Sequence, residues 1–99
     1  MALRIIWSTE AEETFDSIIE YLENNWSEKS TRRFIHKSQD IFSQIIHNPY
    51  MFKASNFQEI RKAVITKHIS LFYFVNKPEG IIELYSFWDN RQNPNKSKF

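Results

Sequence analysis

The sequence predicts a single α+β domain in which an N-terminal helix hairpin packs on one face of an antiparallel sheet. Three observations lead to this class: a short segment with alternating apolar residues begins the chain, two segments with helical spacing follow, and three β-rich runs joined by short turns come last. The predicted element order is therefore β-α-α-β-β-β. The 99 residues suffice for one domain, residues 1–99, and we expect the polar tail at residues 95–99 to fray.

The first half of the chain begins with a strand and a helix. Leu3, Ile5 and Trp7 alternate with their neighbours, which is typical of a short strand. Thr9 and Glu12 form a capping-box pattern, because a threonine and a glutamate three residues later can satisfy the first free backbone N–H groups of a helix. We therefore expect the helix to begin at Thr9. Its apolar stripe consists of Ala11, Phe15, Ile18, Ile19 and Leu22, with Trp26 following.

The second helix follows after a very short connection. Asn24 and Asn25 close the first helix, and Ser27 is the expected N-cap of the second. Asn48 and Pro49 end it, because proline cannot continue a helix. Two helices joined by so few residues form an antiparallel hairpin. The apolar face of the second helix consists of Phe34, Ile35, Ile41, Phe42, Ile45 and Ile46.

Three strands are predicted in the second half, at residues 60–66, 69–75 and 81–88. Lys67 and His68 form the turn between the first two strands. Residues 76–80 hold the only glycine of the chain and form the second turn. Connections this short join neighbouring antiparallel strands, so we expect a meander.

Composition excludes several classes of function. The 41% hydrophobic residues include nine Phe, four Tyr and three Trp, which supply a substantial core. The absence of Cys removes disulfides and thiolate metal sites, and the longest apolar run, residues 71–75, is far shorter than the ~20 residues of a membrane helix. The sequence contains neither a secretion signal nor a glycine-rich nucleotide loop. We expect a cytoplasmic protein without cofactor, membrane contact or small-molecule substrate.

Charge is distributed unevenly along the chain. Residues 1–49 carry five Lys and Arg against eight Asp and Glu, a net charge of −3, whereas residues 50–99 carry eight against four, a net charge of +4. The simplest interpretation is ordinary surface variation. The functional interpretation is a basic sheet surface that meets an acidic chain or a phosphate backbone.

The most unusual segment is residues 87–94, FWDNRQNP, where an aromatic strand ends in charged residues. Arg91 is the best candidate for binding a target, because it leaves a strand anchored by Phe87 and Trp88, and a stiff element holds a cation in a fixed place. In the structural alternative, Asp89 and Arg91 pair locally and shape the turn. Trp88 is more often a core residue than a stacking platform.

RNA cleavage is a second chemistry that the basic half could support. Attack by a 2′-hydroxyl needs a general base, a cation near the phosphorus and an acid for the leaving oxygen. Phosphate could be held by Arg61, Lys62, Lys67 and Arg91, and His68 is the histidine of this half that could transfer a proton. The structural alternatives are that His68 is an exposed turn residue and that Arg61 pairs with Glu59 or Glu83 across the sheet.

The histidines do not indicate a metal site. His36 and His47 lie eleven positions apart on one helix, which separates them by about 16 Å. They cannot share one metal ion. His36 and Asp40, four residues apart, are typical of a solvated pair, so we expect no bound metal.

The order of elements and an ordered set of residues resemble a known family. The set consists of Trp7, Ala11, Ile19, Tyr21, Leu22, Trp26, Phe34, Pro49, Ile60, Arg61, Lys62, Tyr73 and residues 88–94. With these residues the chain resembles the RelE/ParE superfamily of bacterial toxins, the toxic halves of type II toxin–antitoxin pairs. The resemblance covers nearly the whole chain. It implies a compact toxin that inhibits growth, stabilises plasmids and is held inactive by a cognate antitoxin.

The superfamily divides by target. The resemblance implies that ribosome-dependent endoribonucleases use Lys and Arg on the sheet, an Arg near the end of the last strand and a Tyr or His beyond it, whereas the ParE-like branch poisons DNA gyrase. Arg91 matches the arginine of the nucleases. Ser70 stands where they carry an arginine on the third strand, and residues 92–99 contain neither Tyr nor His.

The resemblance therefore favours a ParE-like toxin that inhibits DNA gyrase by binding and not by catalysis. Its candidate target-binding residues are Arg61, Lys62, Lys67, Trp88 and Arg91, and its partner is a cognate antitoxin. One alternative is a ribosome-dependent mRNA endoribonuclease in which Lys62, Lys67, His68 and Arg91 act. Another is a degenerate, non-toxic member that only binds. The identity of the antitoxin and the oligomeric state stay open.

Overall fold

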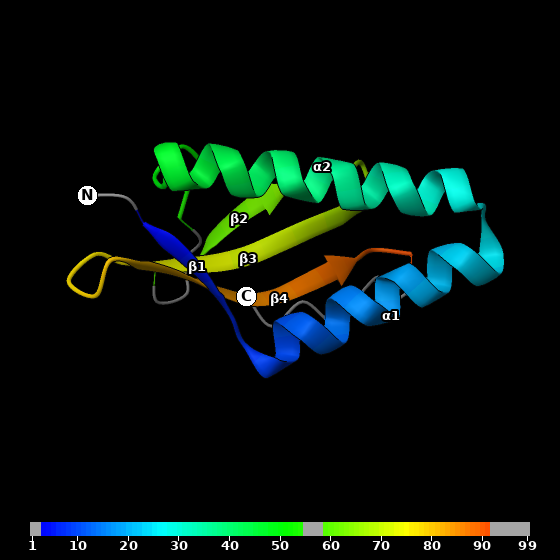
Figure 1. Ribbon diagram of the computed structural model, residues 1–99, viewed down its shortest axis with the longest axis horizontal. Coiled ribbons are helices and arrows are strands. Elements are labelled where there is room, and N and C mark those ends of the chain that lie inside the picture. Colours follow the sequence, from blue (N-terminus) through cyan, green and yellow to red (C-terminus); the bar gives the residue numbers. More distant parts are fainter. Residues whose placement is uncertain (1–2, 55–58, 92–99) are drawn as a thin grey trace.

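The computed structural model describes residues 3–54 and 59–91. The elements follow the predicted order: β1 (Arg4–Trp7), α1 (Thr9–Asn25), α2 (Glu28–His47), β2 (Arg61–Val64), β3 (Ile69–Asn76) and β4 (Ile81–Asp89) (Figure 1). The two helices form the expected hairpin, with only Trp26 and Ser27 between them. The α+β class is confirmed. The polar tail at residues 95–99 lies outside the described residues.

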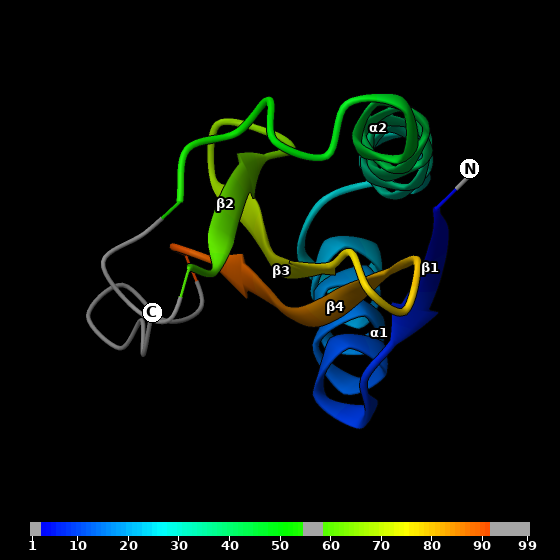
Figure 2. The ribbon, with the colours of Figure 1, turned by 90° about the vertical axis from the view of Figure 1, so that its left-hand side faces the viewer.

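The sheet has four strands in the order β1-β4-β3-β2, and it is mixed. Figure 2 shows it extending from β2 on the left to β1 on the right. The pairs β2–β3 and β3–β4 are antiparallel, as the meander predicts, but β1 runs parallel to β4. The chain reverses twice between β2 and β4, so these strands share a direction. The helix hairpin returns the chain to the end of the sheet where β1 began, so β1 shares that direction too (Figure 1).

The start of α1 differs from the predicted cap. Ser8, and not Thr9, is the N-cap, and its side chain accepts a hydrogen bond of 2.9 Å from the N–H of Ala11. The Ser8 hydroxyl also donates to the carbonyl of Tyr85 at 2.9 Å, which ties the helix start to β4. The capping-box prediction at Thr9 and Glu12 is wrong because Thr9 already lies in the first helical turn. The predicted N-cap of α2 is confirmed: Ser27 accepts from the N–H of Ser30.

The core lies between the helix hairpin and one face of the sheet, which we call the inner face. Phe15 and Phe34 from the helices pack against Phe87 of β4, with ring centroids 5.0 and 6.2 Å from it. Tyr73 of β3 is fully buried beside them, and its hydroxyl donates to the carbonyl of Pro49 at 2.7 Å. Burial raises the pKa of Tyr73 to about 12, because the ionised phenol would lose its hydration.

A β-bulge in β4 determines which residues face the helices. Opposite Phe72 and Tyr73 stand Ser86 and Leu84, so Tyr85 is the additional residue of β4. The extra residue reverses the alternation along the strand, and Asp89 therefore lies on the inner face with Leu84, fully buried. The opposite, outer face carries Lys62, Val64, Ser70, Phe72, Ser86 and Trp88 in the paired positions of β2, β3 and β4.

Candidate binding cleft

A cleft of about 420 Å³ lies between the corner of the helix hairpin and one end of the sheet. Four parts of the chain contribute to it: the end of α1 with the hairpin corner, the first half of α2, the β2–β3 turn with the start of β3, and Arg91, two residues beyond the end of β4. We call it the cationic cleft. Its lining residues are Leu22, Trp26, Ser30, Arg33, Phe34, Lys37, Thr66, Lys67, His68, Ile69 and Arg91.

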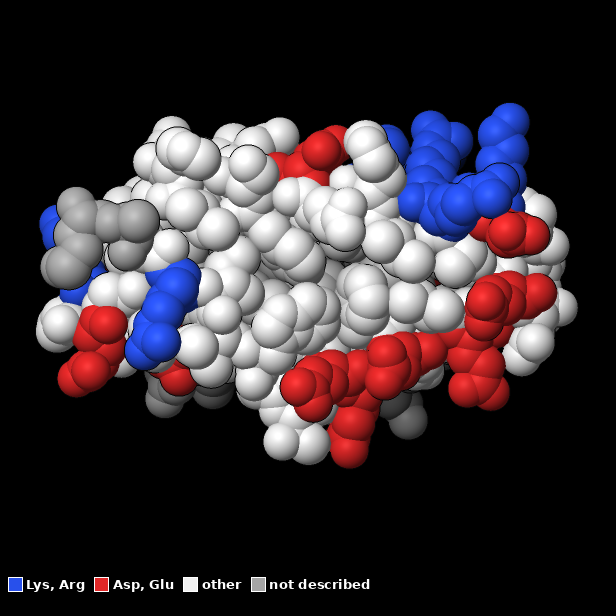
Figure 3. All heavy atoms as spheres, in the orientation of Figure 1, with Lys and Arg blue, Asp and Glu red and all other residues white. Residues whose placement is uncertain are grey.

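Four of the lining residues are cations, and they come from opposite walls. Arg33 and Lys37 lie one helical turn apart on α2, whereas Lys67 and Arg91 come from the sheet side. Figure 3 shows Lys and Arg gathered over the first half of α2, next to a row of acids along α1. Between the walls lie the apolar residues Leu22, Phe34 and Ile69, which are each at most 3% exposed.

Arg91 is held in place by a paired carboxylate. Its Nε and Nη2 atoms donate to the two carboxylate oxygens of Asp89, each at 3.1 Å, and its backbone N–H donates to Asp89 Oδ1 at 2.8 Å. The Asp89 side chain is fully buried and that of Arg91 is 21% exposed. This is a bidentate, charge-assisted pair, the strongest type of side-chain hydrogen bonding available to an arginine. The local pairing considered for Asp89 and Arg91 from the sequence is therefore present.

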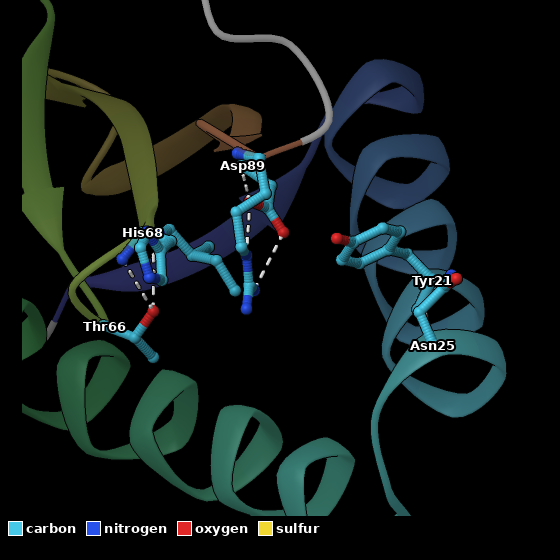
Figure 4. Close-up of polar contacts among 7 residues, drawn as sticks. Tyr21, Asn25, Thr66, His68 and Asp89 are labelled. Carbon is cyan, nitrogen blue, oxygen red and sulfur yellow. Dashed lines mark hydrogen bonds and ion pairs between the residues drawn. The ribbon is translucent and has the colours of Figure 1, made fainter.

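Two aromatic rings complete the surroundings of Arg91. Its guanidinium carbon lies 5.5 Å from the centre of the Tyr21 ring and 5.2 Å from the Trp26 ring, within the range of cation–π attraction. In Figure 4 the ring of Tyr21 extends from α1 toward Asp89 at the end of β4. Trp26, at the hairpin corner, is still 58% exposed. The end of β4 is thus fastened to the helix hairpin, and the partly exposed Trp26 lines the cleft.

The β2–β3 turn brings Lys67 and His68 to the same place. The N–H of Asn90 donates to the carbonyl of His68 at 2.9 Å, so the turn is bonded to the residue after β4. Within the turn, the N–H of His68 donates to the Thr66 hydroxyl at 3.3 Å, and Figure 4 shows the two residues side by side. His68 is half-buried and lines the cleft, so it is a turn residue that is less exposed than the sequence alternative supposed.

The structure separates the five candidate target-binding residues. Lys67 and Arg91 meet in the cationic cleft, whereas Lys62 and Trp88 lie on the outer face. Arg61 lies elsewhere: its Nη1 donates to the carbonyl of Phe52 at 2.7 Å, and its guanidinium carbon is 4.7 Å from the centre of the Tyr50 ring. These contacts stand in place of the pairing with Glu59 or Glu83 that the sequence offered as the structural alternative. Of the five candidates, two therefore line the cleft and three lie outside it.

Sequence reasoning missed the helical wall of the cleft. Ser30, Arg33 and Lys37 recur at intervals of three and four residues, which places them on one side of α2. That spacing could have identified them as a group. Their position opposite the β2–β3 turn depends on tertiary packing and has no signal in the sequence.

Among the residues that the structure describes, no group of three or more His, Asp or Glu side chains could hold a metal ion. His36 Nδ1 lies 3.6 Å from Asp40 Oδ2, with both side chains largely exposed, as expected for a solvated pair. Neither described helix is both long and apolar enough to cross a membrane.

The fold is shared with several solved toxin structures. YoeB from Staphylococcus aureus, described as a dimer, has a TM-score of 0.62 and 19% identity, covering 89% of this chain and 97% of that one. A mutant of the Escherichia coli toxin RelE in the free state has a TM-score of 0.64 and 10% identity, and the match covers 95% of this chain and 90% of that one. The chromosomal ParDE toxin–antitoxin system of P. aeruginosa has a TM-score of 0.64 and 16% identity, and the match covers 90% of this chain and 96% of that one. These likenesses show that the chain shares its fold with these toxins.

The sequence itself identifies the family within this superfamily. Residues 5–94 match the family described as the ParE toxin of the type II toxin–antitoxin system, parDE, and the chain belongs to this family. A comparison with curated protein sequences finds no match. The protein is the toxin of a type II toxin–antitoxin system, and its family implies a cognate antitoxin as partner.

Proposed function

We propose that this toxin inhibits DNA gyrase by binding and does not cleave RNA. The observation that carries the proposal is the engagement of Arg91. Its guanidinium makes a bidentate pair with the buried Asp89 and lies against two aromatic rings, so it is built into the packing at the end of β4. A catalytic cation must be able to meet the charge that develops on the phosphorane. An arginine saturated by a neighbouring carboxylate serves that role poorly.

The outer face of the sheet adds a second argument. Ser70, where the nuclease branch is expected to carry an arginine, pairs with Trp88 across the sheet. Ser70, Phe72 and Ser86 are 8%, 2% and 3% exposed, so the centre of this face offers little surface to a polynucleotide. The match to the ParE family favours gyrase as the target.

Target binding is assigned in this proposal to the cationic cleft. Lys67 and Arg91, both candidates from the sequence, lie there with Arg33 and Lys37. Arg61, Lys62 and Trp88 remain candidates for a separate contact. The toxin would act in the cytoplasm, where gyrase works, and expression without the antitoxin would stop growth, which is the basis of plasmid stabilisation. A degenerate, non-toxic member would leave growth unaffected.

The test is a supercoiling assay with purified gyrase and relaxed plasmid. We expect the toxin to block supercoiling at micromolar concentration, and addition of an equimolar amount of the cognate antitoxin to restore it. Unchanged supercoiling at that concentration would contradict the proposal. The antitoxin arm is the control for a non-specific effect of a basic protein on DNA.

One observation favours the nuclease alternative. Lys67, His68 and Arg91, three of the four residues that it requires, line the same cleft. Primer extension on a translated mRNA tests it: new 5′ ends inside the ribosomal A-site codon, lost in His68→Ala, would support cleavage. Intact mRNA under conditions in which supercoiling is blocked would exclude it.

A further inference from the structure

β1 stops pairing with β4 where the β-bulge begins. The last pair of the two strands is Trp7 with Leu84, and the N–H of Ser8 donates to the carbonyl of Leu84 at 3.1 Å. Tyr85, the additional residue of the bulge, comes next. From Tyr85 onward, the edge of β4 that faces away from β3 has no described strand beside it. Backbone N–H and C=O groups on that edge therefore need partners from another element.

Two hydroxyl groups at the start of the helix hairpin supply those partners. Ser8, the N-cap of α1, donates to the carbonyl of Tyr85 at 2.9 Å. Thr14, in the second turn of α1, accepts a hydrogen bond of 2.9 Å from the N–H of Phe87. The Thr14 hydroxyl donates its own hydrogen to the carbonyl of Glu10 at 2.7 Å, which leaves its oxygen lone pairs to the strand. The bulge is therefore bonded to the helix side at the residue that it inserts and at the second residue after it.

The bond to Thr14 and the packing of Phe87 favour the same register of β4. Phe87 is 2% exposed, so its N–H could not reach water if Thr14 offered no acceptor. Its ring centroid lies 5.0 Å from that of Phe15 and 5.5 Å from that of Trp7. Without the extra residue, Phe87 would stand opposite Ser70 and face away from the helices. Loss of the Thr14 hydroxyl therefore leaves a buried donor unpaired in the register that the rings require.

The register beyond the bulge determines where Arg91 lies. It turns Asp89 to the inner face, where the buried carboxylate accepts hydrogen bonds from the guanidinium and the backbone N–H of Arg91. In the same register, the N–H of Asn90 donates to the carbonyl of His68. In a strand without the bulge, Asp89 would face outward and could not hold Arg91 beside Trp26. The cation at this end of the cleft therefore depends on the bulge.

We infer that Thr14 is a positioning residue of the cationic cleft. Its hydroxyl, together with that of Ser8, stabilises the bulge in β4 and thereby holds Arg91 at the cleft. Thr14 does not itself line the cleft, so it acts through β4. This role deepens the proposed function and rests on it only for the effect on gyrase, because the effect on the strand is measured without a target.

The test measures hydrogen exchange of individual backbone amides by NMR in the full-length toxin. Thr14→Val removes the hydroxyl at nearly constant volume, whereas Thr14→Ser retains it. Relative to the amides of residues 38–45 in α2, we expect those of Phe87, Asn90 and Arg91 to exchange at least about tenfold faster in Thr14→Val. In Thr14→Ser they should keep their wild-type rates within about twofold. Acceleration of the α2 amides by the same factor as those of β4 would indicate a loss of overall stability and would overturn the positioning role.

Thr31→Val is the matched control. Thr31 is a buried threonine of α2 whose hydroxyl donates to the carbonyl of Ser27 at 3.3 Å and, in the described part of the chain, bonds no group of the sheet. Its replacement removes a helix hydroxyl without leaving a donor of β4 unpaired. We expect the relative exchange rates of Phe87 and Arg91 to stay within about twofold of wild type. Equal acceleration in Thr31→Val and Thr14→Val would refute the role of Thr14.

A supercoiling assay connects the strand to the proposed function. R33Q/K37Q removes two cations that line the cleft, and K29Q/R32Q removes two exposed cations of the same helix outside it, with the same change in net charge. These two variants give the reference for a damaged cleft and for an intact one. We expect Thr14→Val to need about threefold to tenfold more protein than wild type for half-inhibition of gyrase, and Thr14→Ser to match wild type.

The outcome for the strand is separable from the outcome for gyrase. Wild-type exchange rates in Thr14→Val would overturn this inference and leave the proposed function intact. Faster exchange in Thr14→Val, with inhibition undiminished in both Thr14→Val and R33Q/K37Q, would support the positioning of Arg91 and remove the cleft from the proposed function.

Discussion

The cationic cleft and the outer face of the sheet are both candidate surfaces, and they differ in how their polar residues are held. In the cleft, cations from α2, the β2–β3 turn and the end of β4 converge on a hollow with an apolar floor. On the outer face, the central side chains Ser70, Phe72 and Ser86 are buried, and Lys62 stands apart at the exposed edge. The described cations of the cleft thus gather where the helix hairpin meets the end of the sheet, which is the surface that the proposed function assigns to target binding.

The largest expected effect is at the carboxylate that holds the cleft together. Asp89→Ala leaves Arg91 packed between rings without its partner, and we expect a loss of about 2–4 kcal/mol in the free energy of unfolding. Lys62→Ala on the outer face is the control and should change it by less than about 0.5 kcal/mol. Urea unfolding followed by circular dichroism measures both. Equal free energies of unfolding for Asp89→Ala and Lys62→Ala would mean that the pair of Asp89 and Arg91 does not fasten β4 to the hairpin.

A pH effect of similar size is expected in the core beneath both surfaces. The pKa of Tyr73 is raised to about 12 by burial, so the unfolded chain loses this proton near pH 10, before the folded protein does. The free energy of unfolding should therefore be unaffected by Tyr73 below pH 10 and fall by about 2–3 kcal/mol between pH 10 and 12.

The matched variants isolate this contribution. Tyr73→Phe should lose most of the decline between pH 10 and 12 and keep only the part due to Tyr85, whose pKa burial also raises, whereas Tyr50→Phe, at a residue that is 49% exposed, should retain the full decline. Urea unfolding at stepped pH gives the profiles. Parallel profiles for wild type and Tyr73→Phe would contradict the assignment.

A smaller effect is expected at the start of α1. Ser8→Ala removes the N-cap and the bond to Tyr85, and should lower the free energy of unfolding by about 1 kcal/mol. Thr9→Ala should have less effect, because Thr9 is an exposed residue inside the first turn. Thermal unfolding of the two variants distinguishes the observed N-cap at Ser8 from the one predicted at Thr9. A larger loss of stability for Thr9→Ala than for Ser8→Ala would support the predicted capping box instead.

The smallest effect is expected for the exposed pair on α2. Glu28 and Arg32 are 81% and 71% exposed, so Glu28→Gln should change the free energy of unfolding by no more than about 0.5 kcal/mol, and by less at high salt. Urea unfolding at low and high salt measures the change. A loss comparable to that of Asp89→Ala would mean that exposure does not distinguish the two pairs.

The sequence predicts the helices and strands of this fold more fully than the way in which the strands pair. The order of elements, the Ser27 cap and the end of α2 at Asn48 follow from local chemistry and are confirmed. The parallel pairing of β1 with β4 is a long-range outcome of where the hairpin returns the chain, and no local pattern encodes it. The bulge at Tyr85 likewise arises from pairing with β3, and it alone turns Asp89 toward the helices.

The candidate site was predicted in part for the same reason. Arg91 and Lys67 follow strand ends, a position that sequence patterns reveal, and both lie in the cleft. Arg33 and Lys37 lie on a helix whose orientation toward the turn depends on packing, and they were not among the predicted site residues. The contact of Arg61 with the carbonyl of Phe52 has no signal in the sequence, and the face on which Trp88 lies depends on the bulge in β4.

The most direct test of the central claim measures gyrase supercoiling with wild-type toxin, R33Q/K37Q and K29Q/R32Q at matched concentrations. Inhibition through the cationic cleft predicts that wild type and K29Q/R32Q block supercoiling alike, while R33Q/K37Q needs about tenfold more protein. Equal inhibition by all three proteins would contradict the role of the cleft. Intact supercoiling in every case, with mRNA cut in a parallel translation reaction, would contradict inhibition by binding altogether.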